Sequence, residues 1–227
     1  REKVILIASN FGLTLNQNRF WLLQAHLRQE GYFKRGIDEF SSFDRYSYEI
    51  KLLKEFVQVI RKLSNLFPDE KIIVRPHPVE DTNGWNDLLG PLPNVEVNRE
   101  DSINHWIRRS KAVIHNGCTS ALEANVSNVP VIAYRPLKSE YERSFPNDIS
   151  HQVFDEEELI GAVRDLLDGN PIESNSGLLK ARLANLDQAN AHKKMVDHWD
   201  QINAENPNLN ERNNWSYLKA RLRFSFL

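Results

Sequence analysis

Short apolar runs that alternate with helical patterns are the feature that most restricts how this chain can fold. Most of these runs are continuous rather than interleaved with polar residues, and they occupy 4–8, 71–75, 95–97, 112–115, 130–134 and 151–154. A strand that is apolar along its whole length is typical of a parallel sheet with helices on both faces. The sequence therefore predicts an α/β fold with a doubly wound parallel sheet.

Helical patterns complete this alternation as far as Gly169. The longest is 44–67, where apolar residues recur at helical spacing until Pro68, and other helices are predicted at 21–28, 102–109, 119–126 and 156–167. After Gly169 a polar linker, 170–177, is followed by two predicted helices, 178–199 and 215–224, with no strand between them. We therefore expect one domain at 1–169 and a C-terminal helical extension at 170–227.

Composition narrows the class of protein. The 227 residues can bury one full core with appendages, and a net charge of -2 gives no reason to expect nucleic-acid binding. The single cysteine, Cys118, allows no intrachain disulfide and fits a reducing, cytoplasmic compartment. No apolar run reaches the roughly 18 residues of a membrane-spanning helix, and no signal peptide is visible. Because the chain starts at Arg1 and leads directly into a strand, we expect a piece of a longer protein.

The segment Lys111–Ala124 is predicted to be a strand, a tight turn and a helix. Such a junction directs backbone N–H groups at whatever lies above the strand, and phosphate is the natural ligand. Gly117 allows close approach of a ligand, while Thr119 and Ser120 add hydroxyl donors at the helix start. An alternative is purely structural, because Ser120 and Glu123 match the capping-box pattern, in which both side chains satisfy helix-end N–H groups.

A second polar motif, Arg75-Pro76-His77-Pro78, follows the next predicted strand along the chain. The Arg75 guanidinium offers a fork of donors suited to phosphate, and His77 can donate to a phosphate oxygen or act as an acid near neutral pH. The two prolines restrict the backbone around His77 before a ligand arrives. In the alternative reading, Arg75 pairs with Glu80 or Asp81 and His77 only caps a loop.

Polar residues follow three of the predicted strands, at Asn10, at His77 and at Asn116-Gly117. Ligands of doubly wound sheets bind outside the carboxyl ends of the strands, near a switch in strand order, so we expect these residues on one rim. His115, inside a strand end, is expected to be a hydrogen-bonded core residue. One cysteine and no paired histidine spacing argue against a zinc site, and neither a G-x-G-x-x-G motif nor a Walker loop is present.

Together these motifs resemble the nucleotide-binding half of bacterial surface-carbohydrate (capsule and O-antigen) biosynthesis proteins of the GT-B glycosyltransferase kind. The likeness is carried by Lys71–Glu80 (KIIVRPHPVE) and His115–Ala124 (HNGCTSALEA), and Ile5–Gly12 is similar to the first strand and loop of that half. An HP motif paired with a later Ser/Thr motif also occurs in bacterial sialyltransferases and Kdo transferases, which use CMP-activated sugars. The resemblance implies a Rossmann-like half-domain that binds a nucleotide sugar, with CMP as its expected nucleotide.

The resemblance also implies roles for individual residues. His77, Thr119 and Ser120 would contact the nucleotide phosphate with Arg75 beside them, and Glu123 would accept hydrogen bonds from ribose hydroxyls. The nucleotide sugar would be a substrate, with a glycan or lipid-linked acceptor and with no metal or other cofactor. A GT-B enzyme has two Rossmann-like domains, so the acceptor-binding domain, which normally supplies the catalytic carboxylate, is expected to be missing on the N-terminal side. The isolated chain would then bind a nucleotide and catalyse poorly.

Two other functions stay open at this point. Teichoic-acid glycerophosphotransferases, which use CDP-glycerol, carry a similar strand end and a later Ser-Ser helix start, although His-Asn-Gly-Cys-Thr-Ser here replaces their Asp-Tyr-Ser-Ser. Alternatively, the chain is a non-catalytic nucleotide-binding module of a polysaccharide assembly complex. The tail at 215–227, which is apolar and basic, is expected either to pack against the protein or to make a peripheral contact with an anionic membrane surface.

Overall fold

The computed structural model describes residues 4–15, 25, 28–29, 39–182 and 191–205. The chain divides into two compact units, Arg1–Ala181 and Arg182–Leu227. The first unit contains the sheet and the helices that cover it, and the second contains α9 (Ala191–Glu205). The domain boundary expected between 169 and 170 lies ahead of this division, and the separate roles of the two parts stay a prediction.

The described residues of the first unit form a six-stranded parallel sheet in the order β3-β2-β1-β4-β5-β6. Its strands are β1 (Val4–Ala8), β2 (Lys71–Arg75), β3 (Val95–Val97), β4 (Ser110–His115), β5 (Val131–Tyr134) and β6 (His151–Val153). Ala8 at the end of β1 pairs with Arg75 on one side and with His115 on the other. This is the strand order of Rossmann folds, with the switch in direction between β1 and β4. The predicted doubly wound parallel sheet is confirmed.

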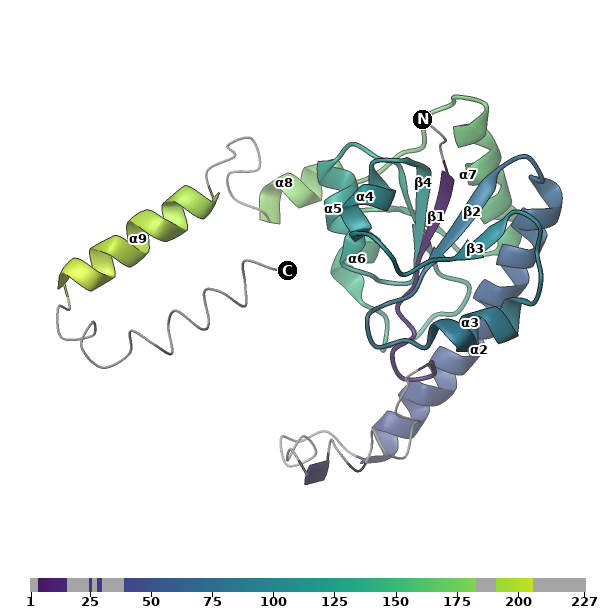
Figure 1. The fold of residues 1–227 in the computed structure, drawn as a ribbon, viewed down its shortest axis with the longest axis horizontal. Coiled ribbons are helices and arrows are strands. Elements are labelled where there is room, and N and C mark those ends of the chain that lie inside the picture. Colours follow the sequence, from purple (N-terminus) through teal and green to yellow (C-terminus); the bar gives the residue numbers. More distant parts are fainter. Residues whose placement is uncertain (1–3, 16–24, 26–27, 30–38, 183–190, 206–227) are drawn as a thin grey trace. The chain divides into compact units, whose positions relative to one another are not determined.

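Helices cover both faces of this sheet. α2 (Glu39–Leu66), α3 (Thr82–Leu89) and α7 (Glu156–Leu167) lie on one face, and α4 (Ile103–Ile107), α5 (Ser120–Val126) and α6 (Ser144–Asp148) lie on the other (Figure 1). Every residue of β1 is buried. Ile5 and Ile7 belong to the apolar cluster that includes α2, α3 and α7, and alternation along a strand turns Val4 and Leu6 to the opposite face. Burial on both faces explains why the strands are continuous apolar runs.

Helix α2 begins at Glu39, earlier than the predicted 44, and ends at Leu66. Pro68, two residues further on, cannot continue the helical hydrogen bonds. The Phe56 ring lies fully buried on this helix, with centroid distances of 5.3 Å to Phe11 and 5.2 Å to Tyr134. Phe56 therefore packs α2 against the ends of β1 and β5, where the polar loops begin.

Two short helices, α3 and α6, are not predicted by the sequence patterns. α3 has 8 residues and begins after Asp81, whose side chain accepts from the Asn83 N–H at 3.0 Å; it ends at Gly90, where φ is 65°. α6 has only 5 residues and no side-chain cap. Segments of this length show too few apolar repeats to be recognised, and burial of side chains such as Trp85 and Pro146 holds them in place.

The C-terminal helices differ from the prediction of one helix at 178–199. α8 (Ser176–Arg182) begins inside the predicted linker and packs Leu179 into the first unit, where this residue is 3% exposed. α9 is a separate helix of the second unit. Most of the predicted helix at 21–28, the predicted helix at 215–224 and the tail at 215–227 lie outside the described residues. Within the described part of the chain, no helix is both long and apolar enough to cross a membrane.

Candidate functional site

A cavity of about 520 Å³ lies at the carboxyl ends of β1, β2 and β4, beside the switch in strand order. It brings together five of the residues that the sequence predicts for a nucleotide site: Arg75, His77, Thr119, Ser120 and Glu123. The two prolines that flank His77 also line it. The rest of the wall consists of residues for which the sequence predicts no role in the site, namely Ala8, Ser9, Arg99, Ile103 and Cys118. We call this space the phosphate cavity, after the ligand that the sequence predicts for it.

Ser120 and Glu123 each place a buried oxygen, Ser120 Oγ and Glu123 Oε2, without a hydrogen-bond partner among the described residues. The capping-box alternative is therefore wrong. Thr119, not Ser120, is the cap residue of α5, and its side chain makes no capping hydrogen bond. A buried polar group without a partner costs about 1–3 kcal/mol. Because Ser120 is only 4% exposed and lines the phosphate cavity, a group bound there can supply the missing partner.

His77 lies on the loop after β2, between two prolines. Its Nδ1 accepts a long hydrogen bond of 3.4 Å from the Val79 N–H, so the proton of the neutral ring belongs on Nε2. Arg99 donates to the carbonyl of Pro78 and so holds the same loop from the side of β3. The loop is therefore fixed while the imidazole lines the phosphate cavity with a donor available.

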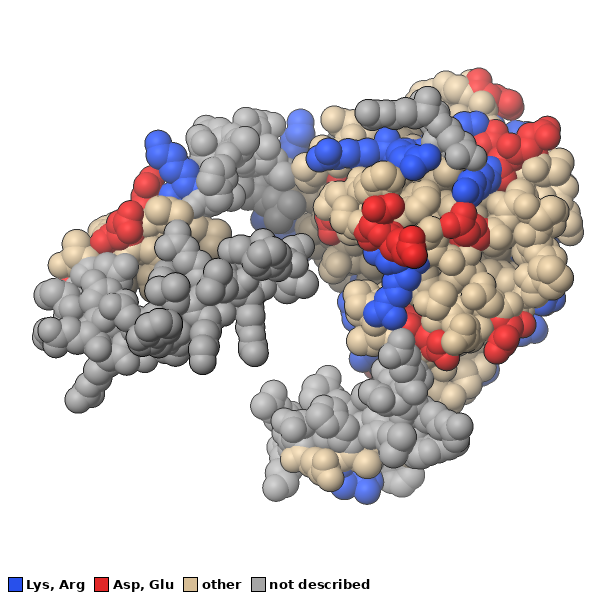
Figure 2. Space-filling model, in the orientation of Figure 1, with Lys and Arg blue, Asp and Glu red and all other residues tan. Residues whose placement is uncertain are grey.

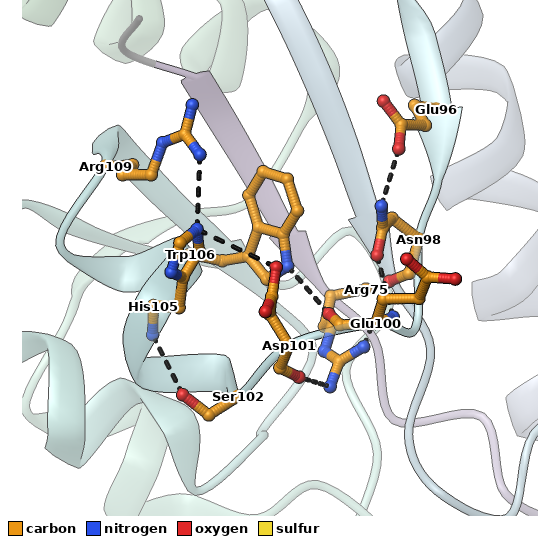
Figure 3. Close-up of polar contacts among 9 residues, drawn as sticks. All are labelled: Arg75, Glu96, Asn98, Glu100, Asp101, Ser102, His105, Trp106 and Arg109. Atoms are coloured by element: carbon orange, nitrogen blue, oxygen red, sulfur yellow. Dashed lines mark hydrogen bonds and ion pairs between the residues drawn. The ribbon is translucent and has the colours of Figure 1, made fainter. Parts of the chain in front are cut away.

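The Arg75 guanidinium donates to the carbonyl oxygens of Asn98 at 3.2 Å and Asp101 at 2.6 Å (Figure 3). These carbonyls belong to the loop between β3 and α4, so the alternative in which Arg75 pairs with Glu80 or Asp81 is wrong. Burial, followed by the nearby Arg99, lowers the pKa of Arg75, while Asp101 opposes the shift. Since a guanidinium carries five N–H donors, Arg75 can hold this loop and still donate into the phosphate cavity.

The loop that Arg75 holds is closed by further contacts. Asp101 adopts a left-handed conformation with φ of 62°, which aspartate tolerates better than most residues. Trp106 Nε1 donates to the Glu100 carbonyl at 3.1 Å, and Ser102 Oγ accepts from the His105 N–H at 3.2 Å (Figure 3). This loop presents Arg99, a second guanidinium at the phosphate cavity. Arg99 lies just past the end of β3, and this position is the only sequence signal that could have identified Arg99 as a site residue.

Glu80 has a structural role beneath the site. Its fully buried carboxylate accepts from Ser9 Oγ at 2.6 Å, the Phe11 N–H at 2.6 Å and Trp85 Nε1 at 2.7 Å. These donors belong to the loop after β1 and to α3. Glu80 therefore fixes the loops after β1 and β2 relative to one another, and with them one wall of the phosphate cavity.

His115 is a hydrogen-bonded core residue, as predicted. The ring is fully buried, and Nδ1 accepts from the Gly117 N–H at 3.0 Å. Nε2 must then carry the proton, which it can donate to Ser150 Oγ at 2.9 Å, and the Ser150 hydroxyl donates to the Pro146 carbonyl at 2.8 Å. This relay joins the loop after β4 to the segment around α6, so it holds the backbone that carries Thr119 and Ser120.

Gly117→Ala is expected to lower the free energy of unfolding by about 1–2 kcal/mol, because Gly117 has φ of 80°, a conformation costly for L-residues. A Cβ there would also lie 3.1 Å from Arg143 Cβ. Chemical denaturation measures the change. The matched control is Gly161→Ala on α7, where a Cβ meets nothing within 4 Å; alanine should stabilise that helix by about 0.4–1 kcal/mol. Equal effects at the two sites would contradict the expectation.

Asn10 and Asn116 lie apart from the five predicted residues that line the phosphate cavity, and Gly117 lines neither that cavity nor theirs. Both line a smaller cavity of about 40 Å³, together with Tyr48 and Glu49 of α2 and with residues after β5. Asn116 Nδ2 donates to the Asn10 carbonyl at 3.0 Å, which bridges the loops after β1 and β4. Their predicted role in nucleotide binding stays a prediction. Among the described residues, no group of three or more His, Cys, Asp and Glu side chains is placed to hold a metal ion.

The fold and the site define a class: a Rossmann-like α/β unit with a polar cavity at its switch point. No protein-family model and no curated protein matches the chain. Solved structures that are similar include UDP-GlcNAc 2-epimerase from Neisseria meningitidis bound to UDP-GlcNAc (15% identity, TM-score 0.46, 88% of this chain and 44% of that chain). Another is the calicheamicin glycosyltransferase CalG4 (14% identity, TM-score 0.47, 89% of this chain and 44% of that chain). A third is the glycosyltransferase SnogD from Streptomyces nogalater (17% identity, TM-score 0.38, 74% of this chain and 36% of that chain). The chain thus spans less than half the length of these proteins.

Proposed function

We propose that the first unit binds a nucleotide sugar and serves as the donor-binding domain of a GT-B glycosyltransferase in bacterial surface polysaccharide biosynthesis. The proposed donor is a CMP-activated sugar, and the acceptor is a glycan or a lipid-linked glycan bound by a second domain. The catalytic residue would come from that second domain. A cytoplasmic location, with peripheral membrane contact through 215–227, belongs to the same proposal.

The observation that carries the proposal is the mixture of donors and acceptors in the phosphate cavity. Arg75, Arg99 and His77 offer donors to an anion, and the buried Ser120 Oγ has no partner in the described part of the chain. Glu123 Oε2, also without a partner among the described residues, needs a donor instead. A simple anion suits the first group but not the carboxylate. A nucleotide satisfies both, because its phosphate accepts hydrogen bonds while its ribose hydroxyls donate them.

Surface charge is consistent with a small ligand rather than nucleic acid. Basic and acidic side chains are interspersed on the visible face of the described residues (Figure 2), and the net charge is -2. A protein that binds nucleic acid through its phosphates usually gathers basic residues on one face. The basic groups that matter for the proposal are the few that line the phosphate cavity.

Ser120→Ala is expected to weaken nucleotide binding by about 1.5 kcal/mol, roughly tenfold in the dissociation constant. Its free energy of unfolding should stay the same or rise, because the substitution removes a buried hydroxyl for which the described residues supply no partner. A capping role would instead cost about 1 kcal/mol of stability. Calorimetric titration with CMP, UDP and GMP and with their sugar conjugates, alongside chemical denaturation, measures both quantities.

The matched control is Ser110→Ala at the other end of β4. Ser110 is also buried, but its hydroxyl donates to the Trp106 carbonyl at 2.8 Å. We expect this variant to lose stability and to keep its nucleotide affinity, the reverse of Ser120→Ala. His77→Ala should lose affinity to a similar extent as Ser120→Ala, with His105→Ala as its control outside the cavity. If no nucleotide binds the wild-type protein at millimolar concentration, the proposed function is wrong.

A further inference from the structure

The smaller cavity holds two amide oxygens that have no hydrogen-bond partner among the described residues, Asn116 Oδ1 and Asn147 Oδ1. Asn147, on α6, is only 3% exposed. The orientation of the Asn116 amide follows from its neighbour, since Nδ2 donates to the Asn10 carbonyl at 3.0 Å and the oxygen is therefore the atom left without a partner. Two buried acceptors in one cavity call for a hydrogen-bond donor.

Residues of the same two loops line this cavity and the phosphate cavity. In the loop after β1, Ser9 lines the phosphate cavity and its neighbour Asn10 lines the smaller one. In the loop after β4, Cys118 lines the phosphate cavity and Asn116 lines the smaller one. A ligand whose phosphate occupies the first cavity can therefore extend a neighbouring group across these loops toward the second.

Size and charge select the group that fits. A volume of about 40 Å³ exceeds the roughly 10–15 Å³ that one water molecule requires, so a hydroxyl or hydroxymethyl group fits, whereas a sugar ring or a second phosphate does not. Glu49 at the wall already accepts from the N–H groups of Leu13 at 2.8 Å and Thr14 at 3.0 Å. Arg135 is paired with Glu142 at 2.5 Å. An uncharged hydroxyl can donate its one proton to either amide oxygen and accept from Arg45 or Arg143.

We infer that the smaller cavity receives a hydroxyl-bearing arm of the group attached to the bound phosphate, with Asn116 and Asn147 as the acceptors that recognise it. The inference rests on the proposed function and names its substrate class: a nucleotide conjugated to a polyol with a free hydroxyl arm. A glycosyl group and a glycerol group both carry such an arm. The cavity thereby distinguishes the conjugated nucleotide from the free one.

The test compares matched ligand pairs by calorimetric titration of the full chain: CMP with CMP-sialic acid, CDP with CDP-glycerol, and UDP with UDP-GlcNAc. The quantity measured is the affinity ratio of the conjugate to the free nucleotide. For at least one pair we expect a ratio above one in the wild type and a decrease of about fivefold in Asn147→Ala, the size of one neutral hydrogen bond. The free nucleotide should bind the variant as it binds the wild type. The pair that responds identifies the polyol as a sugar or as glycerol.

Asn86→Ala, on the exposed side of α3 and outside both cavities, is the control that should leave every ratio unchanged. If Asn147→Ala does not fold, Asn147→Ser is used with the same expectation. If the Asn147 variants bind nucleotides but do not alter the affinity ratio, the inference is overturned. The proposed function then stands, and the smaller cavity holds only water. Loss of affinity for the free nucleotide as well would show a general structural effect and would also overturn it. If no nucleotide binds the wild type, the proposed function itself fails and the inference falls with it.

Discussion

Glu80→Ala is expected to lower the free energy of unfolding by about 3–5 kcal/mol, a large part of the stability of an ordinary domain. The substitution leaves two buried donors without an acceptor, the Phe11 N–H and Trp85 Nε1, and it leaves Ser9 Oγ only the Arg75 carbonyl at 3.2 Å. Each orphaned donor costs about 1–3 kcal/mol. Urea denaturation followed by circular dichroism measures the change. The nucleotide affinity of the remaining folded protein should also fall, because Glu80 fixes the loops after β1 and β2.

The matched control for this prediction is Glu140→Ala. Glu140 is an exposed carboxylate in the loop before α6, where a surface substitution should change the free energy of unfolding by no more than about 0.5 kcal/mol. Glu80→Gln keeps the shape of the side chain but replaces one acceptor oxygen by a donor, so an intermediate loss is expected. A loss of stability below about 1 kcal/mol for Glu80→Ala would contradict the role of Glu80 in fixing the loops after β1 and β2.

Acid is expected to destabilise the protein by about 3 kcal/mol between pH 6.5 and pH 4 through His115 alone. Burial lowers the pKa of His115 to about 3 in the folded protein, whereas an unfolded histidine titrates near 6.5. Above pH 6.5 the ring is neutral in both states. As the pH falls from 6.5 toward 3, the unfolded chain takes up a proton that the folded protein does not, so about 1.4 kcal/mol of stability is lost per pH unit.

His115→Gln isolates this contribution from the other titrating groups. Among these, burial raises the pKa of Glu49, so its effect on stability has the opposite sign and is present in both proteins. The variant should be less stable than the wild type at pH 7, because it alters the relay to Gly117 and Ser150. Denaturation curves at a series of pH values should show this difference shrink by about 3 kcal/mol by pH 4. Parallel pH dependences of the two proteins would refute the prediction.

Much of the fold could be predicted from the sequence, because buried parallel strands are continuous apolar runs and long helices repeat apolar residues at helical spacing. β1 and β2 match their predicted bounds, and α2 follows the apolar repeat that ends before Pro68. α3 and α6 could not be predicted in this way, since each is too short to show an apolar repeat. The sequence pattern also failed at the start of α5. Ser120 and Glu123 match a capping box, but the cap residue is Thr119, one position earlier.

The sequence by itself determined the parallel α/β class and the polar residues at the strand ends, because the period of apolar residues reflects which faces are buried. Only the tertiary structure decided which of those residues share a cavity. Neighbours such as Ser9 and Asn10 line different cavities, and Arg99 joins His77 through the pairing of β2 with β3. The physical reason is that a loop's contacts depend on the strand order and on the helices packed on each face, and these are set by contacts between residues far apart in the chain.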